Sequence, residues 1–179
     1  MFATDAKPSL SVPLPVEVEG GLDVAAQALE LLHQLSYEQY NFVAAPYLQS
    51  SIGQHMRHIL DLFHAASVQG INYDARRRAH PVETDRNVAI AEWQQICGWL
   101  EGLTDTDMAD VVDVRHEVSL NRQVPATSTS TLGRELVFAS SHAVHHFALV
   151  RVSLCAQDIP VAETFGFAPA TLSHFRGDK

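Results

Sequence analysis

The chain has 179 residues, of which 46% are hydrophobic and 18% charged, a composition that predicts a single globular domain over residues 1–179. Its formal net charge of −9 disfavours nucleic acid and anionic membrane surfaces as partners, because both are themselves negatively charged. The two cysteines, Cys97 and Cys155, form no CxxC motif, and neither a secretory leader nor a membrane-spanning apolar run is evident. We therefore expect a cytoplasmic protein with reduced thiols.

The first half of the chain predicts two helices. Residues 1–20 contain three prolines, which favours an extended N-terminal segment. Apolar residues recur every three or four positions over residues 22–35, the period of an amphipathic helix. The Ser-x-x-Gln pattern at residues 51–54 has the form of a capping box, so a second helix is expected from Ser51 to Gln69, before Gly70.

The second half predicts two more helices and a short hairpin. Thr84 could cap a third helix that ends at Leu100 or Gly102. Alternating β-branched residues suggest a β-hairpin around residues 110–125. The Thr/Ser run at residues 127–131 then offers caps for a fourth helix that extends to about Cys155, and prolines and glycine in residues 156–179 predict an irregular tail.

Three histidines lie in a stretch of the fourth helix that has no charged residue, Leu136–Val150. Such a helix is expected in the middle of a bundle. His142 and His146 are four positions apart and point within about 40° of each other, while His145 lies about 60° to the other side of His142. Two imidazoles on one apolar face could bind one divalent cation, or each could form hydrogen bonds within the core.

The second helix offers a third ligand for such a cation. His55 and His58 share one helix face, and either could complete the set. Three imidazoles with one open position are typical of catalytic rather than structural zinc. Asp61, three residues after His58, could orient that ligand, and Glu135 is a candidate carboxylate at the rim of the site.

Further candidates surround this predicted centre. His55 and His145 could act as acid or base, or could simply pack within the core. Arg76 and Arg78 belong to a cluster of mixed charge and could bind a substrate carboxylate; Tyr73 could line the same opening. Each of these charged groups could instead be solvated.

The Ser51-Ile52-Gly53 motif, His58 seven residues after the serine and the His142-x-x-x-His146 pair together resemble the DinB-like family, which includes helical bundles of the YfiT type and thiol-dependent transferases. The resemblance covers about residues 22–155. It implies an all-α, antiparallel four-helix bundle with up-down-down-up order, often a homodimer. It also implies a metal site formed by His58, His142 and His146, with zinc the first choice and nickel or iron as alternatives.

Two functions are compatible with this pattern. The first is a divalent-metal-dependent enzyme that hydrolyses a small molecule or transfers a low-molecular-weight thiol. The second is a noncatalytic bundle in which a structural metal or a histidine network supports a dimer.

Overall fold

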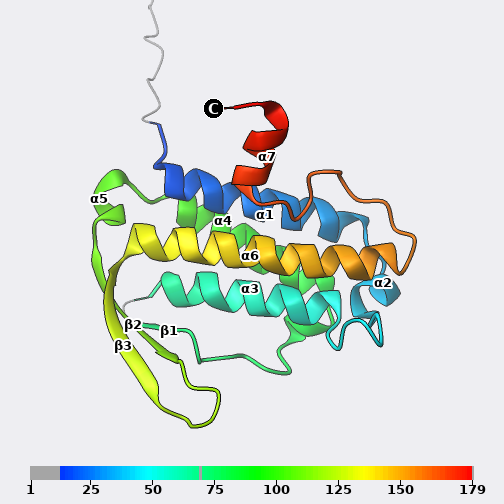
Figure 1. Ribbon diagram of the computed structural model, residues 1–179, viewed down its shortest axis with the longest axis horizontal. Coiled ribbons are helices and arrows are strands. Elements are labelled where there is room, and N and C mark those ends of the chain that lie inside the picture. The colour runs from blue at the N-terminus through cyan, green and yellow to red at the C-terminus, as the bar shows by residue number, and fades with distance from the viewer. Residues whose placement is uncertain (1–12, 69, 179) are drawn as a thin grey trace, which may run out of the picture.

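Four long helices form most of the molecule in this computed structural model, which describes residues 13–68 and 70–178 (Figure 1). Helices α1 and α6 run in one direction, and α3 and α4 run in the other. Helices α1 and α3 each pack against both α4 and α6. The bounds of the four are Val16–Gln34 for α1, Ile52–Ala66 for α3, Arg86–Glu101 for α4 and Leu132–Cys155 for α6.

Large apolar side chains from these helices fill the space between them. Phe63 of α3 and Trp93 of α4 are both fully buried, and their rings meet edge to face at 5.5 Å. Phe147 of α6 is also fully buried. Burial of aromatic side chains on this scale contributes a large part of the hydrophobic stabilisation of a domain this size.

The start of α3 is fixed by the predicted capping box. The Ser51 hydroxyl accepts a hydrogen bond from the Gln54 amide at 3.2 Å, and the Ser51 amide donates to Gln54 Oε1 at 3.0 Å. The helix ends at Ala66, before the predicted Gln69. Helix α4 is capped by Asp85 rather than Thr84, because the Asp85 carboxylate accepts from the Asn87 amide at 2.8 Å.

Residues 16–20 are helical, so the prediction of an extended segment over residues 1–20 is wrong for this part; residues 1–12 lie outside the described structure. Helix α1 begins directly after Pro15, and Glu17 in its first turn interacts favourably with the helix dipole. Gly21 does not end the helix. A Cβ at this position would lie 3.1 Å from Leu100, so the glycine permits close packing on α4.

A three-stranded sheet flanks one end of the helices, in the order β1-β2-β3. Strand β1 (Ile71–Asn72) pairs in parallel with β2 (Val111–Glu117), which pairs antiparallel with β3 (Pro125–Thr131). The predicted hairpin is confirmed, but its second strand includes the Thr/Ser run that was predicted to cap the fourth helix. Only the last residue, Thr131, caps α6, by accepting from the Arg134 amide at 3.3 Å.

Four short helices complete the described part of the chain: α2 (Tyr37–Asn41), the 3₁₀ helix η1 (Pro81–Glu83), α5 (Asp105–Met108) and α7 (Pro169–Arg176). Helix α7 lies within the tail that was expected to be irregular. No helix among residues 13–68 and 70–178 is both long and apolar enough to cross a bilayer.

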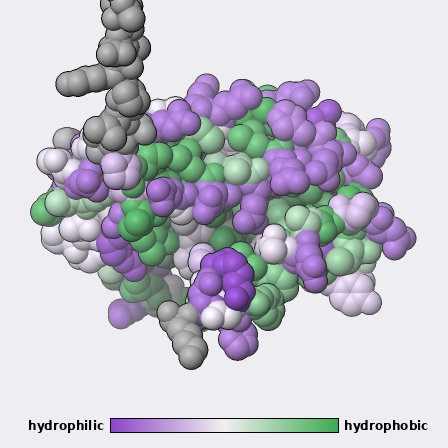
Figure 2. Space-filling view, turned by 90° about the horizontal axis from the view of Figure 1, so that it is seen from above, coloured by the Kyte–Doolittle hydropathy of each residue, from purple (hydrophilic) through white to green (hydrophobic). Residues whose placement is uncertain are grey.

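Helix α6 is not buried on all sides, contrary to the expectation from its apolar sequence. Val137 is 54% exposed and Val152 42% exposed, whereas Ala139, Ala143 and Phe147 on the other face are fully buried. Figure 2 shows hydrophobic side chains at the surface among hydrophilic ones on the face seen from above. The mostly helical fold with its small sheet thus leaves one face of α6 open to solvent.

Candidate metal site

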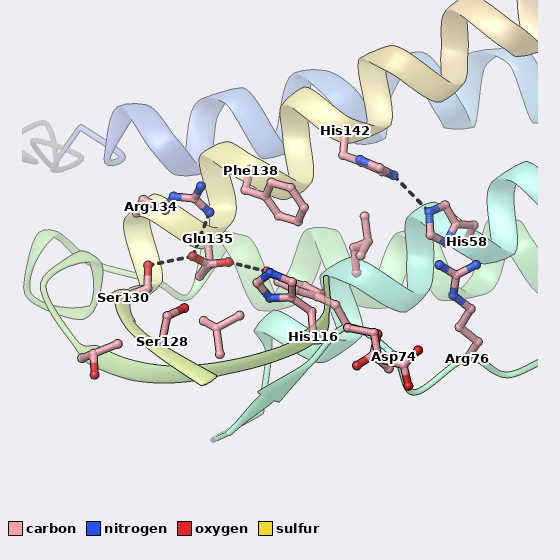
Figure 3. A pocket seen from close by; sticks show the side chains of 15 residues that line it. His58, Asp74, Arg76, His116, Ser128, Ser130, Arg134, Glu135, Phe138 and His142 are labelled. Carbon is pink, nitrogen blue, oxygen red and sulfur yellow. Dashed lines mark hydrogen bonds and ion pairs between the residues drawn. The ribbon is translucent and has the colours of Figure 1, made fainter. Parts of the chain in front are cut away.

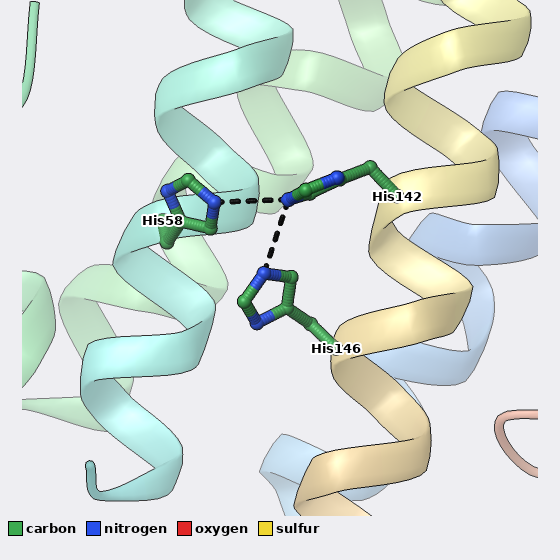
Figure 4. A group of neighbouring side chains, drawn as sticks. All are labelled: His58, His142 and His146. Atoms are coloured by element: carbon green, nitrogen blue, oxygen red, sulfur yellow. Dashed lines mark hydrogen bonds between the residues drawn. The ribbon is translucent and has the colours of Figure 1, made fainter. Parts of the chain in front are cut away.

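Three histidine side chains from α3 and α6 converge at the packed interface of these helices (Figure 4). Nε2 of His142 lies 3.0 Å from Nε2 of His58 and 3.1 Å from Nε2 of His146. Each of the three offers a ligand nitrogen within 4.8 Å of the other two. Two ligands come from successive turns of one helix, and the third comes from the helix packed against it.

Hydrogen bonding within this group cannot satisfy all three nitrogens. Nε2 of His142 carries either one proton or one lone pair, so it can form a full hydrogen bond with His58 or with His146 but not with both. A divalent cation would accept all three lone pairs, and zinc–nitrogen bonds of about 2.0–2.1 Å suit nitrogens separated by roughly 3 Å. The donor set therefore fits a divalent cation.

Burial keeps these imidazoles neutral, the state in which they bind metal. It lowers the pKa of His58 to about 4, with a further contribution from the positive charge of Arg76. Burial and the neighbouring histidines lower the pKa of His146 to about 3. The pKa of His142 is also lowered, mainly by burial. At neutral pH the three rings need not lose a proton before they bind a cation.

His55 lies on the far side of the His146 ring. Its Nδ1 is 2.8 Å from Nδ1 of His146, while Nε2 of His146 faces His142. His55 is 7% exposed, and its own Nε2 has no partner in the described structure. The structure thus places His58 with the α6 pair, and His55 behind one member of that pair.

A cavity of about 470 Å³ opens from the histidine cluster towards the sheet (Figure 3). His58 and His142 lie at one end, and Phe138 and Tyr73 line the middle, their rings 5.1 Å apart. At the other end is Glu135, which is seven residues from His142 on α6 and therefore about 10 Å along the helix. The cavity can hold an extended small molecule that reaches the histidines.

Glu135 is only 2% exposed, and both of its carboxylate oxygens accept hydrogen bonds. One carboxylate oxygen accepts from the Tyr73 hydroxyl at 2.7 Å, and the other accepts from Ser130 at 2.7 Å and from Arg134 at 2.9 Å. Burial and the Glu135 carboxylate raise the pKa of Tyr73. Glu135 therefore organises the cavity wall, two turns away from the histidine cluster.

The sequence did not single out His116 of β2, which also lines this cavity. Its Nδ1 is buried and has no hydrogen-bond partner within the described residues. Every second residue of β2 is less exposed than its neighbours: Val112, Val114 and His116. The alternating pattern predicted for this strand was therefore the signal that could have identified His116 as a residue on its inner face.

Asp61 lies in a buried ion network rather than beside an imidazole. Its carboxylate pairs with Arg57 and with Nε of Arg77, the latter at 2.6 Å. Arg77 also forms two hydrogen bonds with Glu92 of α4, at 3.0 and 2.9 Å. The described structure contains no hydrogen bond between Asp61 and His58, so the expected orienting contact is not formed.

The remaining candidates border the site. His145 is exposed on α6, with its ring centroid 5.6 Å from that of His146. Arg76 and Arg78 are exposed and, with His55, His58 and His146, line a second cavity of about 340 Å³. Arg76 and Arg78 thus lie beside the smaller cavity, whereas Tyr73 lines the larger one.

The family assignment agrees with this geometry. A family model of the DinB superfamily matches residues 23–150, which include all three clustered histidines, and the chain belongs to this superfamily. A curated relative, FK506-binding protein 5 of Rhizopus delemar, is 24% identical over 161 residues. The match covers 90% of this chain and 38% of that protein, so the chain spans about two fifths of the relative's length. No solved structure matches the chain.

Proposed function

We propose that this protein is a metal-dependent enzyme built on an antiparallel four-helix bundle of the DinB type. His58, His142 and His146 would hold one divalent cation, with zinc the first choice and nickel or iron as alternatives. The convergence of three Nε2 atoms beside two cavities carries this proposal: His58 and His142 line the larger cavity, and His58 and His146 line the smaller one. A cation at this position would lower the pKa of a water or thiol that it binds.

The three histidines are more consistent with a metal site that has an open coordination position than with a fully coordinated structural site. Structural zinc sites normally have four protein ligands, and the described residues provide a group of three beside a cavity. The fourth position would then be available to a small molecule. This argument favours catalysis over the alternative of a noncatalytic bundle whose metal supports a dimer, although a homodimer is compatible with either function.

Between the two reactions, we favour thiol transfer over hydrolysis. Both cavities border the cluster and share His58 and Arg76, which leaves room for a thiol and a second molecule. Transfer would form a bond between the thiol sulfur and an electrophilic carbon of the second molecule. The leaving group would depart with its electron pair, and the thiol proton would pass to that group or to solvent. Hydrolysis would need space for only one organic molecule and water.

The chain's own residues would serve this reaction in distinct ways. His55 would accept a hydrogen bond from Nδ1 of His146 and so keep Nε2 of His146 directed into the site. Phe138 and Tyr73 would exclude water from the larger cavity, and Glu135 would hold the Tyr73 hydroxyl in place. His116 would offer its unpartnered Nδ1 to the distal end of the substrate.

Metal analysis of the purified full-length protein tests the proposal. We expect stoichiometric uptake of Zn²⁺, a rise in melting temperature on uptake, and release of acid or consumption of thiol when small thiols and electrophiles are supplied together. Protein that takes up no Zn²⁺, Ni²⁺ or Fe²⁺ and shows no change in melting temperature would contradict it. Hydrolysis of esters or amides without any thiol would favour the alternative reaction.

A further inference from the structure

The smaller cavity beside the histidine cluster is rich in arginine. It measures about 340 Å³, and its lining includes His55, His58, His146, Arg57, Arg76 and Arg78. Glu83 supplies the carboxylate in this lining. The chain as a whole is acidic, with 12 Lys and Arg against 21 Asp and Glu, so three arginines in one small cavity are a local concentration of positive charge.

Two of these arginines have no counter-charge within the described residues. Arg57 is paired with Asp61 and, at 2.6 Å, with Glu83, which neutralises it. The side chains of Arg76 and Arg78 are exposed, and neither forms a hydrogen bond or ion pair among residues 13–68 and 70–178. Two unpaired guanidinium groups therefore border a cluster of neutral imidazoles.

Arg77, between them, anchors the backbone of this segment. Its guanidinium is held by Asp61 and Glu92, and its backbone amide also donates to Asp61 at 3.2 Å. The Arg78 amide donates to the Arg76 carbonyl at 3.0 Å, which closes a tight turn. Because Arg77 is anchored towards α3 and α4, the two flanking side chains are presented to the cavity without a large loss of backbone entropy on binding.

We propose that Arg76 and Arg78 bind an oxyanion, a carboxylate or a phosphate, of the small molecule that reacts at the histidine cluster. This inference rests on the proposed metal-dependent function and names the class of its substrate. Guanidinium groups bind both oxyanions through paired, charge-assisted hydrogen bonds. A cation held by the three histidines would add to the same positive potential, so a ligand with an anionic end and a metal-binding end fits the cavity.

The test uses full-length protein loaded with Co²⁺, whose visible spectrum changes when a thiolate joins the metal. The spectrum is titrated with 3-mercaptopropionate, which carries a carboxylate, and with 2-mercaptoethanol, which carries no charge. We expect the wild type to bind the carboxylate thiol about tenfold more tightly, a typical effect of one charge-assisted contact. The double variant Arg76→Ala/Arg78→Ala should lose this preference and retain its affinity for 2-mercaptoethanol.

Arg122→Ala is the matched control, because Arg122 is an exposed arginine between β2 and β3 and lines neither cavity at the cluster. This variant should keep the preference for 3-mercaptopropionate. Competition with inorganic phosphate or acetate at constant ionic strength identifies which oxyanion binds better. Equal affinity for the two thiols in the wild type, or an unchanged preference in the double variant, would overturn oxyanion binding by Arg76 and Arg78. Neither result would contradict the proposed metal site. Failure of Co²⁺ to bind at all would overturn the proposed function as well.

Discussion

Nδ1 of His55 lies 2.8 Å from Nδ1 of His146, on the side of the ring that faces away from the other two clustered histidines. If Nε2 of His146 gives its lone pair to a metal, Nδ1 must carry the proton and donate it to His55. His55 then carries its own proton on Nε2, which is buried without a partner in the described structure. The contact is therefore compatible with the tautomer in which His146 can bind a metal through Nε2.

Loss of His55 should weaken metal binding without abolishing it. We expect His55→Ala to lower the affinity for Zn²⁺ by about tenfold to a hundredfold, as is usual for groups that orient a ligand. His55→Asn should recover part of this loss, because its carbonyl oxygen can accept the same proton. Competition with a chelating dye measures both affinities. His64→Ala is the control on the same helix, since His64 pairs with Glu92 and not with the cluster. Equal affinities of wild type and His55→Ala would contradict the orienting role.

Replacement of a proposed ligand should have a larger effect. His146→Ala, His58→Ala and His142→Ala should each reduce the Zn²⁺ content of purified protein from stoichiometric to near zero. They should also remove the stabilisation that a hundredfold excess of Zn²⁺ over its Kd gives the wild type, about 2.7 kcal/mol. Elemental analysis and thermal unfolding check these outcomes. The exposed His145 serves as a control, and a His145→Ala protein that also lost its metal would show that the assignment of ligands is incorrect.

The metal-free protein should become less stable as the pH falls from about 6.5 to about 4. In this window the unfolded chain protonates its histidines near their ordinary pKa, whereas the folded chain resists because His58 has a pKa of about 4 and His146 of about 3. The unfolded state binds more protons, so the free energy of unfolding decreases with falling pH.

Urea unfolding at several pH values measures this dependence. His58→Gln/His146→Gln should show a flatter profile between pH 6.5 and 4.5, because it lacks two of the histidines whose pKa is lowered in the folded state. The lowered pKa of Glu92 affects the free energy of unfolding mainly below pH 4.5. A wild-type profile as flat as that of the double variant would argue that these imidazoles are not buried.

Gly53 should tolerate no side chain. A Cβ at this position would lie 2.1 Å from the Glu83 carbonyl oxygen and 2.7 Å from the Tyr40 ring, so Gly53→Ala forces η1 away from the start of α3. We expect destabilisation of about 1–3 kcal/mol, the usual effect of overpacking. Gly98→Ala is the matched control in α4, where no atom lies within 4 Å of the new Cβ, and it should raise stability by about 0.5–1 kcal/mol. Urea unfolding compares them, and similar values for both variants would contradict the close packing.

The helices with strong local signals were predictable from the sequence. The Ser-x-x-Gln pattern at Ser51 correctly placed the start of α3 because the cap is formed entirely by neighbouring residues. The same pattern at Ser36 to Gln39 caps the short helix α2, which the sequence analysis missed, although the capping signal was present. Strand β1 is only two residues long and depends on its partner β2, so no local pattern could reveal it.

The candidate site was predictable in part. Helical spacing correctly placed the two α6 histidines on one face, but it could not decide between His55 and His58, which share a face of α3. Only the packing of α3 on α6 determines which ring meets the pair. The partners of Asp61 also could not all be predicted from helical spacing. Its carboxylate is taken by Arg57 and Arg77, and the second of these is sixteen residues away in a connecting loop.

The convergence of His58 and His142 joins two segments that are 84 residues apart in the chain. A cation held at this point would act as a removable cross-link, since it would bind only while the two segments are together and would oppose their separation. Separation of α6 from α3 by local unfolding would then require release of the ion. Amide hydrogen exchange in these two helices should accordingly slow together when metal is added, while exchange in α7 should not change.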